Sequence, residues 1–293
     1  MASLKEIRNR IRSVSSTRKT TSAMKMVSGA KLKKAQRAIE NSIPYVSKLC
    51  SIVDNFIISL NKEQLPALSQ EREVKKIAII AVSSNNSLCG AFNNNVLKAF
   101  VSTYKNYRKE KKKIVVYPIG KKITEAIDRL NIKTKKTGID IAKLDYNDVY
   151  TLGEKLINDF LEKKIDKVHF IHNHFKSSAV QIIQHKTLLP FFPKPTSEIC
   201  EPQDSDIDYI IEPNKAELIN ELLPKLIKLE FFSGLQDSLT AEHAARSMAM
   251  QIATDNADKL TQELKLSYNK LRQASITNEI ITIIGGAEAI KQS

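Results

Sequence analysis

The sequence predicts an α/β domain inserted between two long helices that pair as an antiparallel coiled coil. Three observations support this fold class. Apolar residues repeat at heptad spacing in the N-terminal segment. The middle of the chain alternates short apolar runs with helical stretches, as α/β folds do. Residues 225–284 contain one glycine and no proline, which favours a single long helix.

Residues 1–60 are predicted to form the first helix of the coiled coil. Apolar residues recur every three or four positions over 4–14 and again over 32–60. Between these stretches the heptad positions are polar, and the apolar stripe shifts to Met24 and its neighbours. We therefore expect the helix to change partner there. Pro44 is expected to kink the helix or restart it, because proline removes a backbone donor.

Residues 74–212 are predicted to form a Rossmann-like α/β domain after a polar linker, 61–73. The alternating order indicates a mostly parallel sheet with flanking helices, closed by a proline-rich run. The predicted strands are 77–82, 114–119, 167–175 and 179–188. The predicted helices are 91–107, 121–130 and 148–162.

Residues 214–293 are predicted to form the second coiled-coil helix. A helix of about 60 residues is about 90 Å long, and it needs a packing partner for stability. The first helix leads into the α/β domain and the last helix leads out of it, so the two should pair antiparallel. The alternative is a compact helical bundle that carries an α/β insert.

The charge distribution indicates an acidic partner. The chain has a net charge of +14, and residues 1–48 hold twelve lysines and arginines against two glutamates. The simplest interpretation of this basic stretch is a solvent-exposed helix face without a partner. Nucleic acid is disfavoured, because the chain lacks tryptophan and its basic stretch has no interleaved aromatic residues. An acidic protein surface is therefore the preferred partner.

Motifs of catalysis and cofactor binding are missing. The chain has no GxxxxGK[ST] and no GxGxxG sequence, and Gly120-Lys121 lacks the upstream glycine of a phosphate loop. The polar segment 83–90 follows the first strand and fits either a helix cap, which is favoured, or an anion site. We therefore expect neither enzymatic activity nor a bound cofactor.

Histidine and cysteine side chains offer two weaker candidates for chemistry. His172 and His174 share one face of a predicted strand and have the spacing of metal ligands, but no third ligand is evident. His169 points to the other face. Cys89 has no paired histidine, so a buried structural thiol is favoured over a nucleophile.

The cysteine count and hydropathy bear on location. Three cysteines, at positions 50, 89 and 200, form no CxxC pair, which fits a reducing compartment without disulfides or zinc. No apolar stretch approaches the roughly 18 residues of a membrane span.

Both ends of the chain carry specific motifs. The sequence ATDNA at 253–257, followed by YNKLRQASIT at 268–277, resembles the C-terminal helix of the gamma subunits of F-type ATP synthases. Residues 5–36 resemble the N-terminal helix of the same family. SLCGAFN at 87–93 and DYIIEP at 208–213 are similar to internal motifs of the family.

This resemblance implies a non-catalytic rotor. The paired helices would stand inside a hexamer of three alpha and three beta subunits, which hold the nucleotide sites. The α/β domain would sit on the membrane c-ring with the epsilon subunit. Proton flow would turn the shaft. The rotating shaft would couple this flow to ATP synthesis or hydrolysis at the beta subunits and would regulate ATPase activity. The absence of a transit sequence indicates a peripheral protein on the cytoplasmic face of a bacterial inner membrane.

The resemblance also implies contact residues. Contacts with the lever region of the beta subunits are assigned to Lys19, Met24, Lys25 and Cys89. Contacts with the catch loops of the hexamer are assigned to Arg272, Gln273 and Thr277. An apolar bearing is assigned to Ile283, Ile284, Ala287 and Ile290. Where the family has Asp-Arg-Gly before Leu-Cys-Gly, this chain has Asn85-Asn86-Ser87, so salt bridges of that loop are not expected here.

Two rival functions come from other classes. An enzyme with a ligand-binding α/β domain would need a phosphate-binding turn and perturbed catalytic groups in a cleft. A coiled-coil tether or nucleic-acid-binding rod would explain the charge and would bind nucleic acid with a steep salt dependence. It would leave the ATDNA and YNKLRQASIT motifs unexplained.

Overall fold

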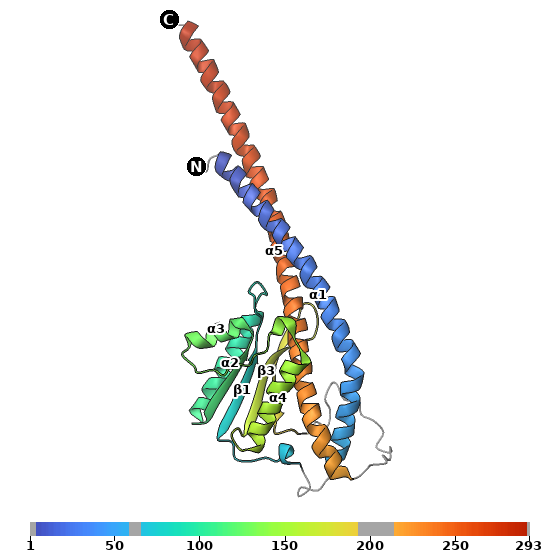
Figure 1. Ribbon diagram of the computed structural model, residues 1–293. Coiled ribbons are helices and arrows are strands. Elements are labelled where there is room, and N and C mark those ends of the chain that lie inside the picture. Colours follow the sequence, from blue (N-terminus) through green and yellow to red (C-terminus); the bar gives the residue numbers. More distant parts are fainter. Residues whose placement is uncertain (1–3, 59–65, 193–213, 292–293) are drawn as a thin grey trace. The chain divides into compact units, whose positions relative to one another are not determined.

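The computed structural model describes residues 4–58, 66–192 and 214–291 (Figure 1). Side chains are not described for Ile58 or for residues 285–291. The chain forms two compact units. The coiled-coil unit consists of Met1–Ser28 with Ser247–Ser293, and the α/β unit consists of Gly29–Arg246. The domain boundaries expected from the sequence, 1–60, 74–212 and 214–293, remain a prediction.

Two long helices run through both units. Helix α1 spans Leu4–Ile58 and helix α5 spans Lys215–Lys291. Pro44 lies inside α1 and Pro224 lies inside α5, so the helix does not restart at Pro44, and the other expectation for this residue, a kink, stays a prediction. Each proline costs a backbone hydrogen bond, but tertiary packing supplies most of the stability of a helix. Past Pro44 that packing comes from Val46, Leu49, Cys50 and Val53, which are buried.

The coiled-coil unit is antiparallel. Arg8 donates to the Tyr268 hydroxyl over 2.7 Å, Arg18 pairs with Asp258 over 2.5 Å, and the Thr21 and Thr254 hydroxyls lie 2.8 Å apart. Partner numbers fall along α5 as they rise along α1, which only an antiparallel pair allows. The predicted fold class is confirmed in this unit.

The α/β unit is built on a four-stranded sheet in the order β2-β1-β3-β4. The first three strands are parallel, and β4 is antiparallel to β3. The predicted strands and helices are all present, with ends that shift by at most two residues. The strands are β1 Lys76–Val82, β2 Lys113–Ile119, β3 Lys167–Phe175 and β4 Gln181–Leu189. The helices are α2 Phe92–Lys109, α3 Lys121–Arg129 and α4 Tyr146–Leu161, with short 3-10 turns at Ala67–Ser69 and Ile141–Lys143.

Strand β1 is buried on both faces, which explains its continuous apolar sequence. Its residues Ala78, Ile80 and Val82 belong to the core formed with α1, α4 and α5. Ile77, Ile79 and Ala81 belong to the opposite core, formed with α2 and α3. The sheet is thus covered by helices on both faces within this unit (Figure 1).

Across the described residues, no helix combines the length and apolarity that a bilayer crossing requires. Cys50 and Cys89 are buried, and neither forms a disulfide within the described residues. Cys200 and the DYIIEP motif at 208–213 lie outside the described residues.

Candidate functional site

The first group of predicted contacts lies on α1 in the coiled-coil unit. Lys19 and Lys25 are exposed, and Met24 is half-buried. Within the described part of the chain, neither lysine has a carboxylate at ion-pair distance. Met26 and Val27 beside them are also exposed. This stretch therefore presents cations without ion-pair partners next to exposed apolar side chains, which suits an acidic partner surface that also makes apolar contacts.

The second group lies further along α5. Arg272, Gln273 and Thr277 are all exposed. The register set by Arg8–Tyr268 places Leu4, the first described residue of α1, opposite the start of this group. Beyond it, α5 continues to Lys291 without a partner among the described residues of its unit.

The third group forms an exposed apolar end of α5. Ile283 and Ile284 are 71% and 54% exposed, and Ile276, Ile280 and Ile281 are exposed as well. Ala287 and Ile290 lie on α5, but their side chains fall outside the described residues. Soluble monomers seldom expose contiguous apolar surface, so this cluster is a candidate interaction site.

Cys89 belongs to a different environment, the loop that follows β1 in the α/β unit. Its side chain is 2% exposed and packs with Phe92, Ala241 and Ala245. Asn93 donates to its sulfur over 3.1 Å. The buried structural thiol favoured by the sequence is what the structure contains. A partner that reaches this loop would touch its exposed neighbour Leu88 instead.

Polar residues at the start of the same loop cap helix α3. The Ser83 hydroxyl accepts from the Ile123 N–H over 2.8 Å, and the Asn85 side chain accepts from the Lys121 N–H over 3.0 Å. Asn85 also donates to Asp140 over 2.6 Å. Two N–H groups in the first turn of α3 are thus already bonded by this segment, which is a capping role, whereas α2, the next helix along the chain, has no side-chain cap.

Arg246 on α5 holds this loop, and the sequence analysis did not find it. It pairs with Glu242 over 2.6 Å and donates to the backbone carbonyls of Asn86 and Ser87 over 3.0 and 3.2 Å. Both members of the ion pair are buried. Burial raises the pKa of Glu242, while Arg246 and Lys31 act in the opposite direction. No sequence signal connects Arg246 with a loop 160 residues away.

The two histidines considered as metal ligands have other partners. The His172 ring is buried and stacks on Phe170 with centroids 4.5 Å apart. His174 pairs with Asp237 on α5 over 2.6 Å. His169 faces the other side, as expected, and lies 3.2 Å from His185. Among the described residues, no group of three or more His, Cys, Asp or Glu side chains is placed to hold a metal ion.

Buried histidine predicts acid sensitivity of the α/β unit. Burial, reinforced by Lys186, His174 and His185, lowers the pKa of His172 from 6.5 to about 3. Above pH 6.5 the ring is neutral in both states. Below pH 6.5 the His172 ring binds a proton in the unfolded chain but not in the folded chain. The free energy of unfolding therefore falls as pH falls towards 3. We expect a loss of about 1.4 kcal/mol per pH unit from this side chain.

The measurement is urea unfolding at several pH values between 7 and 4, with circular dichroism as the signal. In His172→Gln the slope of unfolding free energy against pH should fall by about 1.4 kcal/mol per pH unit, which corresponds to the uptake of one proton. An unchanged slope would show that His172 is protonated in the folded protein. His169 and His243, whose pKa values burial lowers to about 4, add smaller contributions because they are less buried.

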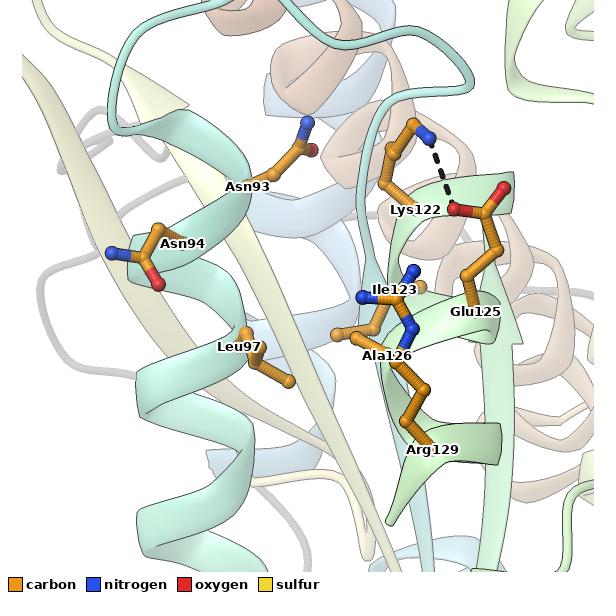
Figure 2. Close-up of a pocket in the computed structure, with 8 residues that line it drawn as sticks. All are labelled: Asn93, Asn94, Leu97, Lys122, Ile123, Glu125, Ala126 and Arg129. Carbon is orange, nitrogen blue, oxygen red and sulfur yellow. Dashed lines mark hydrogen bonds and ion pairs between the residues drawn. The ribbon is translucent and has the colours of Figure 1, made fainter. Parts of the chain in front are cut away.

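A shallow pocket of about 260 Å³ lies between α2 and α3 (Figure 2). Lys122 and Glu125 point towards each other at its rim and form an ion pair over 2.9 Å. Lys122 thereby lowers the pKa of Glu125, so this carboxylate is a poor proton acceptor. The pocket presents no nucleophile beside a base. Its lining is Asn93, Asn94, Leu97, Lys122, Ile123, Glu125, Ala126 and Arg129.

Comparisons with known proteins agree on one family. A family model described as ATP synthase matches residues 3–290. The chain is 49% identical to an ATP synthase gamma chain of Bacteroides fragilis, over 99% of this chain and 100% of that protein. It is 45% identical to the ATP synthase gamma chain of Flavobacterium johnsoniae, over 99% of both chains.

Solved structures share the fold at lower sequence identity. A chain of the Euglena gracilis mitochondrial ATP synthase, from an OSCP/F1/c-ring structure, matches with a TM-score of 0.67 at 18% identity. That match covers 98% of this chain and 94% of the Euglena chain. A chain of the Tetrahymena thermophila central stalk/c-ring structure matches with a TM-score of 0.56 at 19% identity, over 80% of this chain and 99% of that one.

Proposed function

Because the chain belongs to the family of ATP synthase gamma chains, we propose that it is the central rotating stalk of an F-type ATP synthase. It is a non-catalytic subunit, and nucleotide chemistry takes place on the beta subunits. The observation that carries this proposal is the match over 99% of the chain to a bacterial gamma chain. The antiparallel coiled coil and the exposed apolar end of α5 support it.

The partners follow from this role. One copy stands in a hexamer of three alpha and three beta subunits, and the α/β unit binds the epsilon subunit and the membrane c-ring. Ion flow turns the ring and the shaft with it. The asymmetry of the shaft then takes the beta subunits through their states in sequence. The chain is part of a membrane-bound complex, and we place it on the cytoplasmic face of a bacterial inner membrane.

The proposed contacts divide between torque and support. Lys19, Met24 and Lys25 face the acidic lever region of beta. The two lysines have no carboxylate at ion-pair distance among the described residues, which suits this contact. On α5, the catch-loop contacts are Arg272, Gln273 and Thr277, and the apolar bearing is Ile283, Ile284, Ala287 and Ile290.

Magnitudes require that torque is shared among many contacts. One charge that crosses 100 mV supplies about 2.3 kcal/mol, whereas an exposed ion pair is worth about 0.2–1 kcal/mol. No single lysine can transmit the work of several ions. Shape and the sum of contacts must therefore carry the torque.

Lys19→Ala and Lys25→Ala are each expected to lower coupled turnover by less than about fivefold, the equivalent of about 1 kcal/mol. The measurement is the rate of ATP synthesis by the reconstituted enzyme. Lys98→Ala, on the exposed face of α2, is the matched control and should leave the rate unchanged. Complete loss of synthesis in either single variant would rule out shared torque.

Reconstitution tests the function itself. The chain is mixed with alpha and beta subunits from the same source, and complex mass and ATP hydrolysis are measured. One copy should join three alpha and three beta subunits, with a sharp rise in multisite hydrolysis. If the chain stays free and hydrolysis does not change, the stalk proposal fails. Salt-sensitive binding to nucleic acid would then favour the tether.

A further inference from the structure

Two histidines on neighbouring strands of the α/β unit bring their rings together. His169 lies on β3 and His185 lies on β4. His185 is the register partner of Ile171, and His169 precedes Ile171 by two residues, so both side chains lie on the sheet face that α2 covers. His169 Nε2 and His185 Nδ1 are 3.2 Å apart. The hairpin thus places two imidazole nitrogens side by side.

The separation of these nitrogens is that of two ligands of one metal ion. Zinc binds histidine nitrogen at about 2.0–2.1 Å, and two such bonds at a tetrahedral angle place the nitrogens about 3.3 Å apart. The observed separation of 3.2 Å is close to this value. An ion beside the two nitrogens is therefore bound with little movement of either ring.

Tyr107 on α2 favours the tautomer of His169 that binds a metal. Without an ion, the short separation is a hydrogen bond in which one ring donates and the other accepts. The Tyr107 hydroxyl lies 3.5 Å from His169 Nδ1, on the far side of that ring from His185. When Nδ1 carries the proton towards Tyr107, Nε2 presents its lone pair. Hydrogen-bond partners of this kind fix the tautomer of histidines that bind metals.

Both rings are accessible in the form that binds an ion. Burial, reinforced by His185 and Lys167, lowers the pKa of His169 to about 4, so its ring is neutral at pH 7, as coordination requires. His185 is exposed on β4, which lies at one edge of the sheet. Among the described residues, neither histidine has a carboxylate at ion-pair distance.

The donor set selects the kind of ion and limits its affinity. Imidazole nitrogen suits Zn²⁺, Ni²⁺ and Cu²⁺, whereas Mg²⁺ and Ca²⁺ require oxygen ligands. Structural zinc sites use four protein ligands and catalytic sites use three. With two histidines, water fills the other positions, and the nearby charge of Lys167 weakens binding further. An ion here exchanges with solvent.

We propose that His169 and His185 form a two-histidine site for Zn²⁺ or a chemically similar divalent transition-metal ion. The bound ion links β4, which pairs with no other described strand, to β3 and so stabilises this edge of the α/β unit. The proposal concerns this unit alone and does not depend on the stalk function.

Titration of the tag-free full chain with ZnCl₂ tests the site. Binding is measured by isothermal titration calorimetry, with NiCl₂ as a second probe and MgCl₂ as a negative one. His185→Gln is the site variant, because this side chain is exposed and its replacement should leave the fold intact. His243→Gln is the matched control, because it removes another histidine from the same unit. All chains carry Cys200→Ser, which excludes a thiol ligand from outside the described residues.

We expect one Zn²⁺ per chain, binding of Ni²⁺ at the same site and no binding of Mg²⁺. The affinity for Zn²⁺ should fall by about 10-fold or more in His185→Gln, since loss of even an outer partner of a metal ligand has this effect. It should stay unchanged in His243→Gln. Zn²⁺ should raise the urea unfolding midpoint of the control but not of His185→Gln. Absence of binding, or equal affinity in both variants, would contradict the proposal.

A second readout needs no change at a histidine. In the NMR spectrum of the chain that keeps all five histidines, Zn²⁺ should shift the ring proton signals of two of them. If fewer than two signals shift, the two rings do not share an ion and the proposal is wrong. Two shifted signals that persist in His185→Gln would place the ion at other residues and would overturn it as well.

Discussion

Gly120→Ala is expected to destabilise the α/β unit by about 4 kcal/mol or more, out of a total that is about 5–15 kcal/mol for most domains. Gly120 stands between β2 and α3 with φ of 99° and ψ of 143°. Residues other than glycine seldom adopt such a backbone conformation, which alone costs about 1–3 kcal/mol. The rest of the loss comes from a steric conflict.

The conflict involves backbone that has nowhere to move. A Cβ atom at Gly120 would lie 2.1 Å from the carbonyl oxygen of Ser83 and 2.9 Å from its hydroxyl. Ser83 is itself fixed, because its N–H donates to the Ile119 carbonyl over 2.8 Å and its hydroxyl caps α3 at Ile123. Relief would require the carboxyl ends of β1 and the edge strand β2 to separate, which breaks their pairing.

Gly29→Ala is the matched control, since the same substitution there should stabilise. Gly29 lies inside α1, and a Cβ atom would meet nothing within 4 Å. Alanine in a helix interior is favoured over glycine by about 0.5–1 kcal/mol. Urea unfolding of both variants by circular dichroism measures the difference. A Gly120→Ala protein with the unfolding midpoint of the unmodified chain would show that the loop is softer than this geometry implies.

Elements with strong periodicity were predictable from the sequence. The run IAIIAV of β1 is continuous and apolar because helices cover both faces of that strand. The long helices α1 and α5 followed from heptad spacing and from the scarcity of glycine. Of the two outcomes expected at Pro44, a kink or a restart, the restart does not occur, because the stability that neighbouring packing gives to a proline-containing helix is not visible in local sequence.

Contacts between distant segments were not predictable from local patterns. The strand period placed His172 and His174 on one face correctly, but it gave no sign that Phe170 and Asp237 would be their partners. The exposed residues Arg272 and Thr277 came from family resemblance, and their polar character alone would have assigned them to a solvated helix face. Arg246 was missed because a lone arginine in a helix carries no signal of burial.

Arg246→Met is expected to destabilise the α/β unit by about 3–5 kcal/mol, the usual cost of leaving one member of a buried ion pair without its partner. The substitution keeps a long side chain but removes the donors to Glu242, Asn86 and Ser87. The loop carbonyls then lose their hydrogen bonds, and Glu242 stays in a site that is 8% exposed.

A second substitution separates charge from packing. Glu242→Gln in the Arg246→Met background should recover part of the lost stability, because a neutral amide in this site needs no counter-charge. Burial already raises the pKa of Glu242 in the folded chain. Loss of Arg246 raises it further, so the single variant should be less impaired near pH 5 than near pH 8.

Urea unfolding at both pH values measures these effects. The penalty of Arg246→Met should grow with pH, whereas the penalty of the double variant should not depend on it. A single variant with the same loss at pH 5 and pH 8 would mean that Glu242 reaches water once Arg246 is gone. In that case Arg246 would stabilise the unmodified protein through its hydrogen bonds to the carbonyls of Asn86 and Ser87. Its ion pair with Glu242 would serve only to position the arginine.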